Sequence, residues 1–123
     1  MAGKFQAMVH LGFLNSRLKD FYDIHFLAQN QSFRKGTLKD AIQTTFLHRK
    51  TDLENRKLVF STSFINDAQK EQDWKRFLER NDMEVPGSFA VIMNKIRDFL
   101  DPVLDEKNDA LFWNLHQWKW IDA

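Results

Sequence analysis

The sequence contains no cysteine, which excludes disulfide bonds, thiolate metal ligands and cysteine nucleophiles. Only two prolines and four glycines interrupt its 123 residues, so helices have few places where they must end. No apolar run reaches the ~20 residues that cross a membrane, and no apolar signal segment follows the first residues. We therefore expect a cytoplasmic, mainly helical protein without a membrane partner.

The sequence also lacks an excess of charge of either sign. Its 18 basic and 17 acidic side chains give a net charge of +1, so no global field attracts nucleic acid or an anionic membrane, and only a local patch stays open. The four histidines are scattered and show none of the spacings of a metal site. We expect no metal site within this chain.

What the sequence has in quantity is apolar and aromatic surface. Apolar residues make up 43% and aromatic residues 14%, and twelve phenylalanines stand against one tyrosine. Phenylalanine has no polar group, so most of these rings belong in a core or a contact surface. This amount of apolar surface suits a single helical domain over residues 1–123.

Apolar residues recur at three- and four-residue steps along most of the chain, which is typical of helices. Thr37 and Asp40 form a capping-box pattern at the start of the third predicted helix, 37–49. Pro102 should end or kink the last predicted helix at Asp101. A loop or short helix is favoured for 58–65, because no partner strand is evident. The predicted fold is all-α, a compact bundle of about five helices with an aromatic-rich C-terminal tail. The predicted helices span 4–14, 17–29, 37–49, 66–80 and 89–101.

The C-terminal tail carries Trp113, Trp118 and Trp120. Such rings could stack on nucleotide bases. We favour the simpler interpretation, in which an extended tail lies over the bundle and its indole rings cover a small core.

Two carboxylates lie within the second predicted helix, 17–29. The apolar residues of this helix are distributed almost all the way around it, as in a helix that is buried on every side. Asp20 and Asp23 are three residues apart and share a face, with Leu27 between them. Carboxylates in an apolar stripe need a cation, backbone donors or a metal. Spacing alone favours structural ion pairs with Arg17, Lys19 or another basic side chain, and a functional site is the alternative.

The residues around these carboxylates favour the functional site. Lys-Asp-Phe-Tyr-Asp-Ile at 19–24 follows Asn-Ser-Arg at 15–17, and a lysine-led helix begins with Lys4. With these pieces, the stretch 2–104 resembles the helical C-terminal portion of the AbiEii/AbiGii nucleotidyl transferase toxin family. Weaker matching pieces are Ala41-Ile42, Thr44-Thr45-Phe46, Arg49, Thr51, Trp74, Phe77-Leu78 and Phe99-Leu100 before Pro102.

The resemblance implies a nucleotidyltransferase of the DNA polymerase β type that acts in toxin–antitoxin and phage-abortive systems. Such toxins transfer a nucleotidyl group from a nucleoside triphosphate, with Mg²⁺, to an acceptor that is tRNA in some members. By this resemblance Lys4 would contact the triphosphate, and Asp20 or Asp23 would position or deprotonate the acceptor hydroxyl or orient the lysine. Arg17 and Lys19 are further candidates for binding the nucleotide or a partner.

One part of the family pattern has no counterpart in the sequence. The chemistry needs a Gly-Ser turn followed by an Asp-x-Asp pair that holds divalent metal, whereas Gly87-Ser88 leads into Phe89-Ala90-Val91. We therefore expect that the N-terminal α/β half is absent and that the chain is inactive alone. We also expect self-association or a complementing chain over the apolar surface left uncovered, and an antitoxin as a possible partner.

Two alternatives stay open. One is a stand-alone helical module that binds an antitoxin, another protein or tRNA, and the other is an unrelated bundle in which the motif arises by chance. Convergence of Lys4, Asp20 and Asp23 on one concave spot favours a site, whereas separate ion pairs favour the binding module. A Lys4 helix that packs beside the helix of the two aspartates excludes chance.

Overall fold

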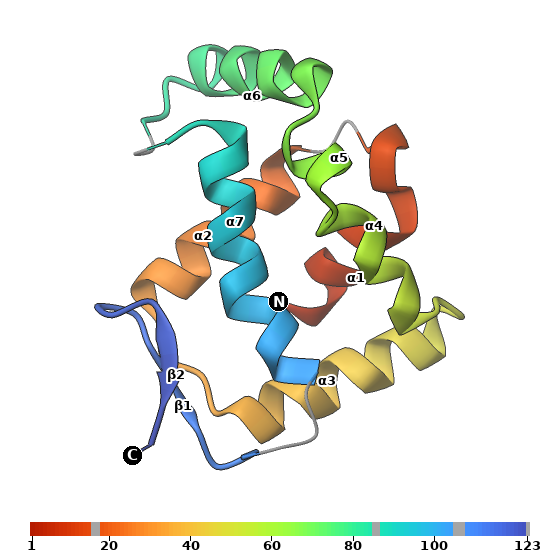
Figure 1. Ribbon diagram of the computed structural model, residues 1–123, viewed down its shortest axis with the longest axis vertical. Helices are drawn as coiled ribbons and strands as arrows, with labels where there is room; N and C mark the ends of the chain where they lie inside the picture. Colours follow the sequence, from red (N-terminus) through yellow and green to blue (C-terminus); the bar gives the residue numbers. More distant parts are fainter. Residues whose placement is uncertain (16–17, 85–86, 105–107, 123) are drawn as a thin grey trace.

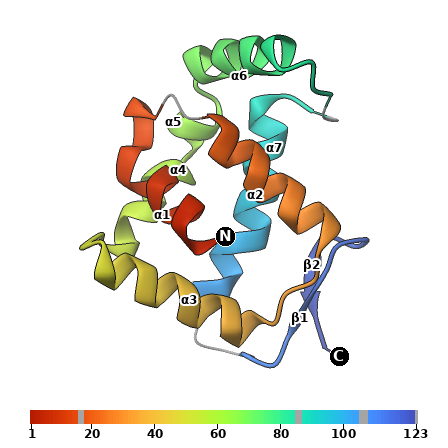
Figure 2. The same cartoon turned by 180° about the vertical axis from the view of Figure 1, so that it is seen from behind.

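The computed structural model describes residues 1–15, 18–84, 87–104 and 108–122, and these form α-helices, short 3-10 helices (η) and one two-stranded sheet (Figures 1 and 2). In chain order the elements are α1 (Ala2–Leu11), η1 (Gly12–Leu14), α2 (Leu18–Asn30), α3 (Lys35–His48), η2 (Leu53–Asn55), α4 (Arg56–Val59), α5 (Thr62–Ile65), α6 (Ala68–Arg80), α7 (Phe89–Leu100), η3 (Asp101–Leu104), β1 (Phe112–Asn114) and β2 (Lys119–Ile121).

The predicted fold class is correct in its helical character and wrong in two details. The described residues contain seven α-helices instead of about five, because two four-residue helices, α4 and α5, occupy the segment in which a loop or short helix was favoured. The chain is also not strictly all-α, because the tail folds back as an antiparallel hairpin with Trp113 opposite Trp120.

Several helix ends follow from side chains that are local in sequence. Ser61, Asp67 and Ser88 accept hydrogen bonds from the backbone amides of Phe64, Lys70 and Val91, and so cap α5, α6 and α7. At its other end α7 stops at Leu100, and the chain continues as a 3-10 turn through the proline at position 102.

The start of α3 differs from the prediction. The helix begins at Lys35, so Thr37 lies inside it and the predicted capping box is not its beginning. The first backbone amides of α3 find their acceptors far along the chain. The backbone amide of Lys35 donates to the carbonyl of Leu111, and that of Gly36 donates to the carbonyl of Asp109, each at 2.9 Å. Backbone of the tail therefore replaces a side-chain cap.

The core lies where α1, α2 and α7 meet, with α3 closing one side. Figure 1 shows α6 across one end of the molecule, and α3 with the hairpin at the opposite end. In α1 the side chains of Phe5 and Met8 are completely buried, and in α7 those of Phe89, Ile92 and Phe99 are. α1 packs against both α2 and α3, and this packing fixes the positions of the polar side chains that α1 carries on its other side.

The helix α2 is buried on its inner side only, whereas the sequence pattern predicted cover on every side, part of it from outside this chain. Phe21, Ile24 and Ala28 point into the core, but Phe26 is 49% exposed and stacks on Tyr22 with a ring distance of 6.2 Å. Phe26 therefore belongs to the apolar pattern of α2 although no other described element covers it.

Within the described part of the chain, no helix is long and apolar enough to span a membrane.

The tryptophans of the tail cover the core, as predicted. The indole Nε1 of Trp113 donates to the carbonyl of Ala28, that of Trp118 to Lys95 and that of Trp120 to Phe99, each at 2.8 Å. The Trp113 ring also lies 4.7 Å from that of Phe99. Because these three indoles bond to backbone carbonyls, they hold the hairpin on α2 and α7 instead of presenting donors to a nucleotide.

A buried histidine lies beneath this hairpin. His25 is 2% exposed, its ring lies 5.4 Å from that of Trp118, and its Nε2 has no hydrogen-bond partner among the described residues. Burial, followed by the charge of Lys95, lowers the pKa of His25 to about 4. His25 is therefore neutral in the folded protein.

This histidine predicts a loss of stability in weak acid. Because the pKa of His25 in the folded state lies below its ordinary value of 6.5, its contribution is complete above that value and is lost as the pH falls toward 4. We expect this residue to lower the free energy of unfolding by roughly 2 kcal/mol between about pH 7 and pH 5, measured by urea unfolding. His25→Gln should flatten the profile, whereas exposed His10→Gln should retain it. Equal slopes for wild type and His25→Gln would contradict this assignment.

Candidate functional site

The side chains of Lys4 and Asp23 meet across the contact between α1 and α2. Lys4 Nζ lies 2.8 Å from Asp23 Oδ2, and Lys19 Nζ lies 3.1 Å from the same oxygen, from one turn earlier on α2. The Lys4 and Asp23 side chains are partly exposed, at 36% and 19%, whereas Lys19 is 70% exposed. The stronger link of this ion-pair group is therefore the long-range one, because its ends are better shielded from water.

Two opposing effects set the ionisation of Asp23. Burial would raise its pKa, but the hydrogen bonds and charges of Lys4 and Lys19 outweigh burial, and the pKa of Asp23 is held below its ordinary value. Asp23 is thus an ionised carboxylate in contact with two ammonium groups. It is suited to orient Lys4 and unsuited to take up a proton.

A polar cavity of about 310 Å³ opens beside this ion pair. Its walls are formed by Met1, Gly3, Lys4, Ala7, Asp20 and Arg49. Lys4 therefore borders the cavity and also contacts Asp23, while Asp20 is 5% exposed and lies in the cavity wall. Lys4 and Asp20 therefore line one cavity, and Asp23 contacts Lys4 without being among the lining residues.

The two other candidates from the sequence, Lys19 and Arg17, differ in what the structure says of them. Lys19 contacts Asp23 but is not among the residues that line the cavity. Arg17 lies outside the described residues. Asn15, which follows η1, is buried, and its carbonyl accepts a hydrogen bond from Lys70 Nζ of α6.

A family model described as "Nucleotidyl transferase AbiEii toxin, Type IV TA system" matches residues 1–109. The chain belongs to this family. No curated protein and no solved structure matches this chain. The AbiEii match spans Lys4, Asp20 and Asp23, and the Lys4 helix packs beside the helix of the two aspartates. The interpretation of an unrelated bundle with a chance motif is therefore wrong.

Two further side chains at or beside the Lys4 cavity were not singled out from the sequence. Arg49, at the C-terminal end of α3, borders the Lys4 cavity, and its Nη1 lies 3.0 Å from Oε1 of Gln6. Both were noted only within matching pieces of the family pattern, Arg49 as a weak piece and Gln6 within the stretch that begins at Lys4. The signal that could have found them is a buried polar residue on a helix face that is otherwise apolar.

The Mg²⁺ implied by the AbiEii resemblance does not fit the residues present. No three His, Cys, Asp or Glu side chains gather within the described residues in a way that could hold a metal ion, and Asp23 is already held by two ammonium groups.

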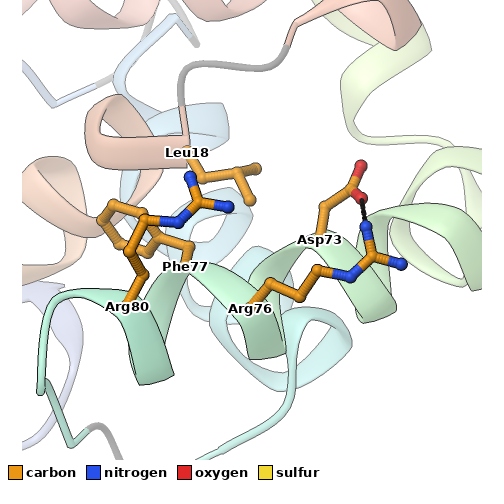
Figure 3. Close-up of a pocket in the computed structure, with 5 residues that line it drawn as sticks. All are labelled: Leu18, Asp73, Arg76, Phe77 and Arg80. Atoms are coloured by element: carbon orange, nitrogen blue, oxygen red, sulfur yellow. Dashed lines mark ion pairs between the residues drawn. The ribbon is translucent and has the colours of Figure 1, made fainter.

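A second cavity of about 210 Å³ lies between the start of α2 and α6. Its lining residues are Leu18, Asp73, Arg76, Phe77 and Arg80, and Figure 3 shows the guanidinium of Arg76 turned toward Asp73, 3.8 Å away. Leu18 and Phe77 give this cavity apolar walls. Both cavities therefore combine cationic side chains with a carboxylate in their walls.

The Lys4–Asp23 pair generates a direct prediction for ionisation. Lys4→Met removes the closer ammonium and should raise the pKa of Asp23, measured by carboxyl NMR titration, because burial then acts against a single lysine. Lys19→Met should raise the pKa less, since the Lys19 ammonium is more exposed and better screened. Lys75→Met, on the exposed side of α6, is the control and should leave the pKa unchanged. A pKa of Asp23 that is insensitive to Lys4→Met would disprove the ion pair in solution.

Proposed function

We propose that this chain forms the triphosphate-facing helical part of a nucleotidyltransferase toxin, with Lys4 as the phosphate-binding residue and Asp20 and Asp23 as its carboxylates. The observation that supports the proposal is the placement of Lys4 between a carboxylate at 2.8 Å and an open polar cavity. An ammonium oriented in this way is a suitable ligand for the anionic oxygens of a nucleoside triphosphate.

The division of roles follows from the contacts of each side chain. Lys4 has three N–H donors, and among the described residues it uses one on Asp23, which leaves two for phosphate oxygens. Asp23 holds Lys4 in place. Asp20, in the cavity wall, is the carboxylate that positions the hydroxyl of the acceptor and accepts its proton.

The reaction assigned to the site is nucleotidyl transfer. The acceptor oxygen attacks the α-phosphorus of the triphosphate, the bond from that phosphorus to the bridging oxygen breaks, and pyrophosphate leaves. Positioning and charge neutralisation supply most of the catalysis in such transfers. Lys4 contributes by balancing the charge of the phosphate oxygens, and tRNA is the acceptor that the family resemblance suggests.

In this proposal the metal-binding Asp-x-Asp pair comes from an α/β part outside these 123 residues, in the same polypeptide or a second one, and the helical part does not transfer nucleotides alone. The absence of a carboxylate cluster from the described residues supports this division. An antitoxin is the partner expected of a toxin–antitoxin protein.

An exposed apolar surface suits the docking of that α/β part. Phe13 and Leu58 are half-exposed and Leu14 is 88% exposed. Phe13 and Leu14 belong to η1, which packs on α4, the helix that carries Leu58, and an added Cβ at Gly12 would be 3.2 Å from Cδ2 of Leu58. Burying such a surface favours association by roughly 25 cal/mol per Å², so the isolated chain is expected to self-associate when the α/β part is missing.

Calorimetric titration of each ribonucleoside triphosphate into the purified chain tests the proposed function. We expect saturable but weak binding, with a Kd on the order of 1 mM, because only part of the site is present. Lys4→Met should abolish it, and Lys75→Met, which removes a lysine from α6, should not.

Two results would count against the proposal. If no triphosphate binds to the wild-type chain, the helical part is a scaffold or a module that binds a protein. If binding is unchanged in Lys4→Met, the triphosphate is held elsewhere.

A further inference from the structure

A second cation faces the Lys4 cavity from a different helix. Arg49 follows the last turn of α3, and the packing of α3 on α1 brings its guanidinium to the cavity wall near Gly3 and Lys4. The residue lies 45 positions from Lys4 in the sequence, so only the fold brings the two charges to one cavity.

The side-chain partners of Arg49 are neutral. Its Nη1 donates to Oε1 of Gln6 at 3.0 Å and to the carbonyl of Gly3 at 3.5 Å. Among the described residues no carboxylate lies within ion-pair distance of its guanidinium, whereas Arg56 pairs with Glu54 and Asp101. Arg49 is therefore held in place without being neutralised, and it keeps donors for an anion.

Gln6 is the residue that holds Arg49. It is 5% exposed on α1, and its Nε2 donates to Oγ1 of Thr51 at 2.8 Å. The Thr51 hydroxyl in turn donates to the backbone carbonyl of Arg49 at 3.2 Å. Because the amide nitrogen of Gln6 is engaged by Thr51, its oxygen is fixed toward the guanidinium.

The location of Gln6 makes this arrangement specific. A buried amide on an otherwise apolar helix face carries a desolvation cost that a leucine would not, and the cost is offset only when both ends of the amide are bonded. Both ends are bonded here, and both bonds lead to the segment that presents Arg49.

We propose that Arg49 is a second phosphate-binding residue of the Lys4 cavity and that Gln6 is its positioning residue, with Thr51 fixing the amide. This inference rests on the proposed function and adds to it the residue that meets the triphosphate from the side of α3. Lys4 acts as a compact charge, and Arg49 offers a planar fork that can contact two oxygens at once. Together they balance more of the triphosphate charge than either does alone.

Titration of GTP and of inorganic pyrophosphate into single and double variants tests this inference. Arg49→Gln should weaken binding of both ligands about tenfold or more, since a hydrogen-bonded charge is lost. Arg49→Lys should recover only part of the affinity, because it restores the charge without the fork. The matched control is Arg80→Gln, which changes an arginine of the second cavity and should leave binding unchanged.

A double-variant cycle separates positioning from a general structural role. Gln6→Met should weaken binding when Arg49 is present and have no further effect in the Arg49→Gln background. Equal losses in both backgrounds would mean that Gln6 acts on the fold and would overturn its positioning role. Circular dichroism on each variant confirms that the helices are retained.

The two proposals fail in distinguishable ways. If Lys4→Met abolishes GTP binding while Arg49→Gln and Arg49→Lys leave it unchanged, the role of Arg49 is disproved and the proposed function stands. If the wild-type chain binds neither GTP nor pyrophosphate, both proposals fall together.

Discussion

The candidate site depends on the burial of one side of α1. Phe5 and Met8 are completely enclosed, and they hold the helix between α2 and α3. The polar residues of the same helix then have fixed partners: Lys4 meets Asp23 of α2, and Gln6 meets Arg49 at the end of α3. Ordinary core packing thus sets the geometry of the charges, because the interior is dense and resists sliding of one helix against another.

Much of the fold and part of the site could be predicted because the relevant information is local or is carried by the family pattern. Three-to-four residue periodicity located the long helices, and Pro102 marked the end of the last one, where the structure changes to a 3-10 turn. The family motif linked Lys4 to the aspartates of α2, and in the structure Lys4 borders one cavity with Asp20 and contacts Asp23. The indole-rich tail was correctly expected to cover the core.

The features that escaped prediction are set by contacts between distant segments. Carbonyls of the tail satisfy the first amides of α3, so no local sequence signal marks its start at Lys35. Phe26 belongs to the apolar pattern of α2 yet remains open to solvent, since periodicity cannot say which neighbours are present. Arg49 became a site candidate only when α3 packed on α1, and no spacing in the sequence expresses that contact.

The hairpin shows that the family match and the packed core of this protein end at different residues. The family match ends at residue 109, yet Trp113 is a buried member of the core and bonds to α2 from beyond that point. Leu111, also outside the match, supplies a carbonyl to the first turn of α3. A domain boundary drawn at the end of the family match would separate Trp113 from the hydrophobic core to which it belongs. Residues 111–121 thus belong to the scaffold that holds α2, α3 and α7 in place.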